Sequence, residues 1–315
     1  MTEPLLRLLQ GRGERITVGA LPWVAPVYRA MPQVAEVLEF PFAHGGLQWA
    51  ARRALARTLR GRFAAAYVCP NSLKSALLPW WAGIPRRVGY AGEMRLGLIN
   101  HRLPNPPSKE RPPMVPFYAA LSGQALPPNA RPQLGIRPEA QQAALQTWGL
   151  QAGGYYAVAP GAEYGPAKRW PAAHFAEVLR SLPAPAVLLG SAKDAEVCAQ
   201  IAGALPEGQC HNLAGRTPLD GAIALIAGAR AMLSNDSGLM HVAAALDIPQ
   251  VAVFGSSSPH HTPPLNPRAQ VLWLKDDASY QPPLDCAPCF ERVCPLGHTR
   301  CLQDIAPERV RACLP

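Results

Sequence analysis

The sequence has few charged residues and no long apolar run. Charged residues make up only 16% of the 315 residues, and aromatic residues only 7%. No apolar segment approaches the roughly 20 residues that a helix needs to span a bilayer, and residues 1–10 lack the basic start and apolar core of a signal peptide. These absences disfavour a membrane-spanning protein and export by a signal peptide. The 49% of apolar residues suffices for one large or two ordinary globular domains.

Aspartate is absent from the first 140 residues, and charge is unevenly distributed along the chain. Residues 1–140 hold 18 Lys and Arg against 7 Glu, a net charge of +11, whereas residues 141–315 carry −2. A basic half suggests a domain that meets an acidic partner. Nucleic acid, anionic lipid headgroups and an acidic sugar all fit this charge, and a solvated arginine-rich surface is the alternative.

The order of strand-like and helix-like segments predicts an α/β fold. In the first half, we expect strands at 15–21, 34–40, 65–69 and 87–90, and helices at 4–9, 24–30, 47–60, 73–81 and 115–121. In the second half, we expect strands at 155–159, 186–189, 211–213, 231–234 and 251–254, and helices at 138–149, 173–182, 195–205, 219–229 and 238–246. Apolar strands that alternate with helices imply parallel sheets covered on both faces.

Two doubly wound domains that face a cleft are therefore expected, with residues 1–137 in the first and 138–315 in the second. Proline-rich segments predict a loop at 104–116 and an interdomain connection at 124–138. A doubly wound domain normally begins with a strand and a glycine-rich turn. Because this sequence begins with a predicted helix, we expect the first strand and loop of the N-terminal domain to be missing.

A glycine- and lysine-containing segment, residues 160–171, lies between a predicted strand and a predicted helix. Gly161 and Gly165 allow backbone amides to approach a ligand closely. Lys168 and Arg169 supply cations, and the N-terminus of the following helix adds partial positive charge. This combination predicts a diphosphate site, and an ordinary loop with surface cations is the alternative.

A second polar segment, residues 234–245, follows the predicted strand at 231–234. Asp236 ends the strand, Ser237 and Gly238 open a helix, and His241 lies one turn further along. These groups can hold phosphate oxygens or ribose hydroxyls at the sheet edge where ligands bind. The alternative is an ordinary helix cap with a structural histidine.

Four cysteines near the C-terminus form a C-x2-C-x4-C-x6-C pattern. They are Cys286, Cys289, Cys294 and Cys301, and His298 lies among them. Four thiolates on a short loop can hold Zn²⁺ tetrahedrally, although the second pair does not have standard zinc-ribbon spacing. Structural zinc, disulfides and free thiols all remain open interpretations, with stable disulfides disfavoured in a reducing compartment.

The segments at 160–171 and 234–245 resemble the lipopolysaccharide heptosyltransferase II family of glycosyltransferases. Residues 70–76, residues 89–95 and the cysteine cluster share this resemblance. The resemblance covers nearly the whole chain. It implies the two-Rossmann GT-B architecture and transfer of heptose from ADP-heptose onto heptosyl-Kdo2-lipid A, with inversion. It also implies no catalytic cofactor, no nucleic-acid partner, and a cytoplasmic location at the inner membrane surface.

The resemblance implies a donor site in the C-terminal domain. Its expected residues are Gly161, Ala162, Glu163, Lys168, Asp236, Ser237, Gly238 and His241. Lys168 is expected to stabilise the diphosphate. The family's general base lies in the first loop that we expect to be missing, so the base is unassigned, and Glu93 cannot be given that role from sequence.

The acidic acceptor that the resemblance implies would suit the arginines of the predicted helix near residues 47–62. Arg53, Arg57 and Arg60 are expected on one helix face, where guanidinium groups can bind carboxylates and phosphates. Lys74 and Arg95 are candidates to join them. A solvated basic face is the alternative.

Rival functions remain within and outside this class. Another heptosyltransferase, of type I or III, is the nearest rival. A binding protein that retains the ADP-sugar pocket but lacks the base comes from a different class. A dinucleotide-dependent oxidoreductase is disfavoured, because no G-x-G-x-x-G segment follows a predicted strand.

Overall fold

The computed structural model describes residues 1–43, 46–107 and 111–315. The chain divides into two units, residues 1–132 and 133–315, slightly before the boundary expected after residue 137. Part of the proline-rich loop expected at 104–116, namely residues 108–110, lies outside the described residues. Within the described ranges, none of the helices is long and apolar enough to cross a membrane.

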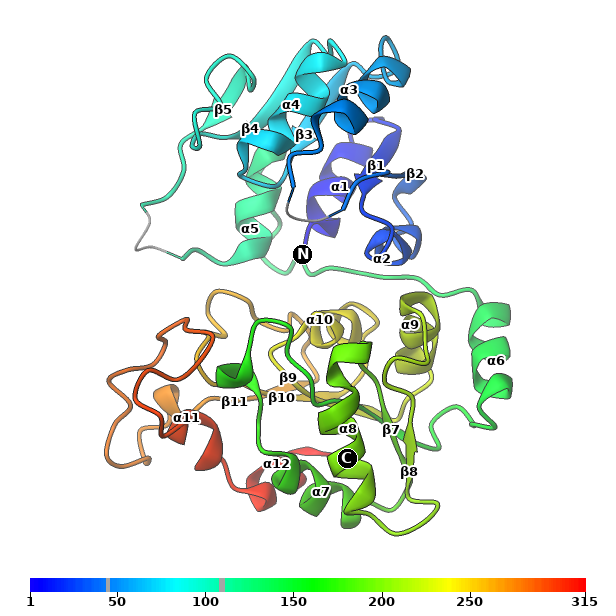
Figure 1. Ribbon diagram of the computed structural model, residues 1–315, viewed down its shortest axis with the longest axis vertical. Helices are drawn as coiled ribbons and strands as arrows, with labels where there is room; N and C mark the ends of the chain where they lie inside the picture. The colour runs from blue at the N-terminus through cyan, green and yellow to red at the C-terminus, as the bar shows by residue number, and fades with distance from the viewer. Residues whose placement is uncertain (44–45, 108–110) are drawn as a thin grey trace. The chain divides into compact units, whose positions relative to one another are not determined.

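The first unit contains two small parallel sheets with helices around them (Figure 1). Its elements are α1 (Glu3–Gln10), β1 (Ile16–Ala20), α2 (Ala25–Arg29), β2 (Val34–Glu39), α3 (Trp49–Thr58), β3 (Ala65–Val68), α4 (Leu73–Trp81), β4 (Arg86–Tyr90), β5 (His101–Leu103) and α5 (Met114–Ala119). Strand β1 pairs with β2, and a separate sheet has the order β3-β4-β5. Helix α3 packs against α4, and α1 packs against α5.

The second unit is built on one parallel sheet of six strands. Its elements are α6 (Pro138–Thr147), β6 (Tyr156–Ala159), α7 (Ala172–Arg180), β7 (Ala186–Leu188), α8 (Ala195–Gly203), β8 (Cys210–Asn212), α9 (Leu219–Ala227), β9 (Ala231–Asn235), α10 (Gly238–Ala245), β10 (Gln250–Val253), β11 (Ala269–Leu272), α11 (Arg300–Gln303) and α12 (Pro307–Cys313). Its strand order is β11-β10-β9-β6-β7-β8. Every residue of β6, β9 and β10 is buried, as expected for central strands covered on both faces.

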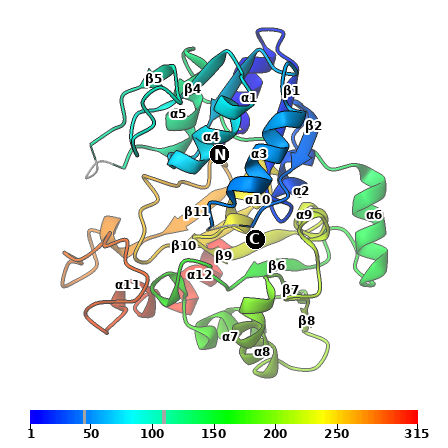
Figure 2. The same cartoon turned by 45° about the horizontal axis from the view of Figure 1, so that its top comes forward.

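Helices cover both faces of this sheet. Helices α7, α8 and α12 lie on one side, and α9 and α10 lie on the other (Figures 1 and 2). Helix α9 is deeply buried, since five consecutive apolar residues from Ala222 to Ile226 are buried. The sequence-based expectation of an α/β fold is therefore confirmed. The short edge strand β11, whose four residues are half-buried or exposed, was not among the expected strands.

Candidate active site

The candidate site lies at the carboxyl edge of three neighbouring strands of the second unit. The chain first builds the sheet outward from β6 through β7 and β8, and then returns to the other side of β6 with β9 and β10. Open α/β sheets bind ligands at such a reversal of strand order. Residues 160–170 follow β6 and are called the donor loop here. Residues 236–238 follow β9, and residues 255–258 follow β10.

Asn235, the last residue of β9, holds both ends of the donor loop. Its side chain is fully buried. The Asn235 Nδ2 donates a hydrogen bond to the Pro160 carbonyl at 2.6 Å, and its Oδ1 accepts one from the Trp170 backbone N–H at 3.0 Å. The Trp170 indole is also buried and donates to the Ile305 carbonyl at 3.0 Å. The loop therefore starts and ends at fixed points on the sheet edge.

Lys168 and Asp236 meet at the centre of this edge. Lys168 Nζ donates to Asp236 Oδ2 at 2.6 Å, and Ser257 Oγ donates to the same oxygen at 2.6 Å. The side chains of Lys168 and Asp236 are only 19% and 6% exposed. The Lys168 ammonium also lies 5.3 Å from the ring centre of Tyr164. A largely desolvated cation at a ligand-binding edge suits a diphosphate.

Helix α10 brings its N-terminus to the same edge. Ser237 caps the helix, and its Oγ accepts a hydrogen bond from the Met240 backbone N–H at 3.4 Å. Gly238 opens the helix, and His241 lies within electrostatic range of Lys168 and Asp236. The dipole of α10 adds partial positive charge beside Lys168.

Residues 161–163, in the first half of the donor loop, have their own set of partners. Ala162 is buried, and a side chain at Gly161 would overlap with the Asp194 carboxylate. Glu163 is exposed and pairs with Lys193 at 2.5 Å. Its hydrogen bond to Lys193 lowers the pKa of Glu163, and the guanidinium groups of Arg292 and Arg169 act in the same direction. Glu163 is therefore a carboxylate in a cationic neighbourhood, separate from the Lys168–Asp236 pair.

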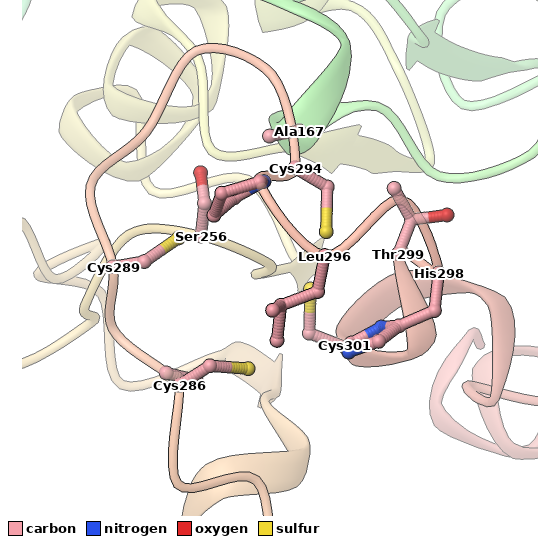
Figure 3. A pocket seen from close by; sticks show the side chains of 11 residues that line it. Ala167, Ser256, Cys286, Cys289, Cys294, Leu296, His298, Thr299 and Cys301 are labelled. Atoms are coloured by element: carbon pink, nitrogen blue, oxygen red, sulfur yellow. The ribbon is translucent and has the colours of Figure 1, made fainter.

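The four predicted cysteines line one small cavity. Cys286, Cys289, Cys294 and Cys301 surround a space of about 20 Å³ together with His298, and all four are free thiols. Cys294 and Cys301 are directed into this space from opposite sides (Figure 3). In the part of the chain that the structure describes, no group of three or more His, Cys, Asp or Glu side chains is already arranged for a metal ion.

The thiols of this cluster differ in their electrostatic surroundings. Burial raises the pKa of Cys301 to about 12, and the three other thiols of the cluster add to that rise. Burial also acts to raise the pKa of Cys294, but the backbone N–H groups of residues 296–299 lower it on balance. Backbone donors around a sulfur stabilise a thiolate, as they do in metal–thiolate sites.

The expected basic surface of the first unit is only partly formed by the predicted residues. Arg53 and Arg57 are exposed on α3, and the exposed Arg60 lies just beyond the end of that helix. Arg53 lies 5.8 Å from the ring centre of Trp81 on α4. Lys74 is half-buried in the first turn of α4. These positions leave three guanidinium groups accessible to an anionic ligand.

Arg95 does not belong to this exposed surface, which corrects the expectation for that residue. It is only 1% exposed. Its guanidinium donates to the Pro70 carbonyl at 2.9 Å, to Asn71 Oδ1 at 3.2 Å and to the Tyr90 carbonyl. Burial lowers the pKa of Arg95, and the nearby Glu93 carboxylate opposes this effect. Arg95 therefore joins the segments at 70–71 and 90–95 instead of facing an acceptor.

Several residues of the site were absent from the sequence-based set. Asn235 and Ser257 were missed because their roles depend on the pairing of β9 with β6 and β10. Tyr164 and Arg292 were missed because their contacts join segments more than a hundred residues apart. The only available indication was that Asn235 stands beside Asp236 at the end of a predicted strand.

Comparison with known proteins identifies the class of this fold and site. Residues 52–299 match glycosyltransferase family 9 (heptosyltransferase). The chain belongs to this family, and it is therefore a glycosyltransferase.

The similar proteins include lipopolysaccharide heptosyltransferase 2 of Escherichia coli K12, which is 42% identical over 330 residues, covering 98% of this chain and 92% of that protein. Lipooligosaccharide heptosyltransferase 2 of Haemophilus influenzae is 40% identical over 277 residues, covering 82% of this chain and 80% of that protein. The solved structure of E. coli ADP-heptose LPS heptosyltransferase II superposes with a TM-score of 0.84 at 39% identity, covering 99% of this chain and 92% of that one. The expected GT-B architecture is thereby confirmed.

Replacing Lys168 tests the diphosphate site. Lys168→Ala removes the cation, and loss of one charge-assisted contact costs about 1.5–3 kcal/mol, or roughly 10- to 150-fold in ADP affinity. Isothermal titration of the purified variant with ADP measures this change. Lys275→Ala, which removes an exposed lysine elsewhere in the same unit, serves as the control. Parental ADP affinity in Lys168→Ala would remove this residue from the site.

Replacing Asn235 tests the closure of the donor loop. Asn235→Asp puts an oxygen in place of the amide that donates to Pro160, so a buried carboxylate faces a carbonyl. We expect a loss of about 1–3 kcal/mol in the free energy of unfolding, measured by urea denaturation. Asn212→Asp is the matched control, because only its Oδ1 is used, as acceptor for the Ala214 N–H at 3.1 Å. Equal stability of the two variants contradicts the assignment.

Proposed function

We propose that this chain transfers heptose from ADP-heptose onto the heptosyl-Kdo2-lipid A inner core of lipopolysaccharide, with inversion at the anomeric carbon. The observation that carries this proposal is the Lys168–Asp236 pair, at 2.6 Å, at the strand reversal of a family 9 fold. The printed names of the most similar proteins, heptosyltransferases of type 2, support it.

Charge stabilisation explains how the donor site would act in this reaction. Transfer breaks the bond between the anomeric carbon and a diphosphate oxygen, so negative charge develops on the departing ADP. Lys168, whose side chain is only 19% exposed, and the N-terminus of α10 would offset that charge. Asp236 and Ser257 would keep the ammonium in place before the donor binds.

A direct assay separates the transferase from a protein that only binds the donor. Purified protein is incubated with ADP-heptose and heptosyl-Kdo2-lipid A, and release of ADP and the mass of the lipid product are measured. Release of ADP with a heptosylated product supports the proposal. Binding of ADP-heptose without product supports the alternative of a catalytically impaired binding protein.

The first unit is proposed to bind the acceptor at the anionic surface of the inner membrane. Arg53, Arg57 and Arg60 are exposed there, and Trp49 and Trp80 expose 48% and 45% of their surface on α3 and α4. Trp49 and Trp81 contact edge to face at 4.5 Å. Tryptophan favours the headgroup region of a bilayer, and arginine favours phosphates and carboxylates. This combination supports a peripheral position on the cytoplasmic side.

Charge reversal of the three arginines tests this assignment. A triple Arg53→Glu, Arg57→Glu, Arg60→Glu variant is expected to raise the acceptor KM at least several-fold while ADP affinity stays near the parental value. The difference should shrink in high salt, because exposed charges are screened over about 8–10 Å near physiological ionic strength. Arg86→Glu, an exposed arginine at the start of β4, is the single-site control. Unchanged acceptor KM in the triple variant would mean that the acceptor binds elsewhere.

We also propose that Cys286, Cys289, Cys294 and Cys301 hold one structural metal ion, with zinc favoured by the all-thiolate donor set. Three observations support this proposal: the four thiols line one cavity, two of them face each other across it, and backbone donors surround Cys294. Because the four sulfurs are not already arranged around one point in the described residues, binding of an ion would require the cysteine side chains to rearrange. A metal here would stabilise a loop that is otherwise poor in secondary structure.

Metal analysis of the purified chain tests the thiolate site. Protein prepared without a metal-affinity step is expected to contain about one zinc ion per chain by mass spectrometry. Cys294→Ser should lose the ion, whereas Cys210→Ser, a cysteine of β8 outside the cluster, should retain it. Metal-free parental protein whose four cluster thiols are reduced, as counted after denaturation, would contradict the site.

A further inference from the structure

The segment that carries the cysteines, residues 286–301 and called the cysteine loop here, lies directly against the donor loop. The Ala167 backbone N–H donates to the Arg292 carbonyl at 3.1 Å, and the Tyr164 hydroxyl donates to the Phe290 carbonyl at 2.7 Å. The Phe290 N–H in turn donates to the Ser256 carbonyl at 2.8 Å. These three bonds join the cysteine loop to the loops that follow β6 and β10.

The contact is close and involves the lysine of the donor site. The Arg292 guanidinium and the Lys168 ammonium each lie 5.3 Å from the ring centre of Tyr164. Tyr164 is therefore a shared aromatic partner for one cation from each loop. Gly165 passes so close to Arg292 that any side chain there would overlap with the Arg292 carbonyl, and its φ of 154° is one that few other residues adopt.

The residues that make these contacts stand between two of the cysteines. Phe290 follows Cys289 directly, and Arg292 lies two residues before Cys294. Phe290 adopts a left-handed backbone conformation with φ of 56°, which costs energy for a residue other than glycine. Any ligand that fixes Cys289 and Cys294 therefore fixes the carbonyls of Phe290 and Arg292 that the donor loop uses.

We propose that the cysteine loop forms one side of the donor site, next to the donor loop. We propose further that metal occupancy of its four thiolates strengthens binding of the donor's diphosphate. Phe290 and Arg292 are positioning residues that act through Tyr164 and Ala167 on Lys168. This inference rests on the proposed donor and metal sites. Because coupling between two binding sites is reciprocal, ADP must also strengthen metal binding by the same factor.

Two titrations of the 315-residue chain test the coupling. ADP affinity is measured by isothermal titration on the zinc-loaded protein and on the same protein stripped with a chelator and returned to buffer. We expect ADP to bind about 5- to 100-fold more weakly after stripping, within the usual range of coupling between sites. In the reverse experiment, saturating ADP should raise zinc affinity by the same factor and so lower the fraction of zinc that a competing coloured chelator holds at equilibrium.

Variants separate the contact from the metal. Tyr164→Phe loses the hydrogen bond to Phe290 but leaves all four cysteines, so it should keep its zinc while its ADP affinity depends less on metal. Arg292→Ala should weaken ADP binding several-fold in the zinc-loaded protein, whereas Arg180→Ala, an exposed arginine at the end of α7, should not. Cys294→Ser should bind ADP as the stripped protein does, and Cys210→Ser as the parent does.

Each outcome has a distinct meaning. Equal ADP affinity with and without zinc overturns the coupling but leaves the donor and metal sites standing. If the parental protein binds ADP but never holds a metal, the metal-dependent part of the proposal is wrong. If Arg292→Ala also binds ADP as tightly as the parent, the cysteine loop is not part of the donor site. Protein that holds zinc but does not bind ADP shows that the donor-site proposal itself has failed.

Discussion

The buried amide of Asn235 is the constraint on which the proposed donor site depends. A single side chain at the end of β9 donates to the start of the donor loop and accepts from its end. The neighbouring residue, Asp236, receives the loop's lysine. The last residue of one central strand and the residue after it thus set both the path of the loop and the position of its charge, and a shift of β9 relative to β6 would disturb both together.

The second unit concentrates its chemistry at one sheet edge because its strand order reverses there. Loops that are far apart in sequence meet at β6, β9 and β10, and the cysteine loop reaches the same place from beyond the last strand. The first unit contributes a different property, an exposed group of arginines beside tryptophans. The proposed donor and acceptor sites thus lie on different units and differ in their residue types.

The sequence predicts features that depend on local pattern, and it misses those that depend on pairing. The buried strands β6, β9 and β10 are mostly apolar, so their positions could be expected, and so could the placement of Lys168 and Asp236 at one sheet edge. Ser257 contacts Asp236 only because β10 lies beside β9 in the sheet. The hydrophobic pattern of the sequence does not predict this strand order. Arg95 was misplaced because a guanidinium can be buried where carbonyl oxygens surround it, and those carbonyls come from segments whose proximity is tertiary.

Because the Asn235 amide fixes both ends of the donor loop, part of the loop's conformational entropy is lost during folding and not when a ligand binds. A free loop of this length would have to be ordered when its ligand arrives, at a cost of about 1–2 kcal/mol per residue that becomes fixed. Here the ends are fixed, and Tyr164 and Ala167 are hydrogen-bonded to the cysteine loop, so part of that cost is met during folding, before any nucleotide binds. The affinity of such a site reflects its contacts more directly, because less ordering is left to oppose them.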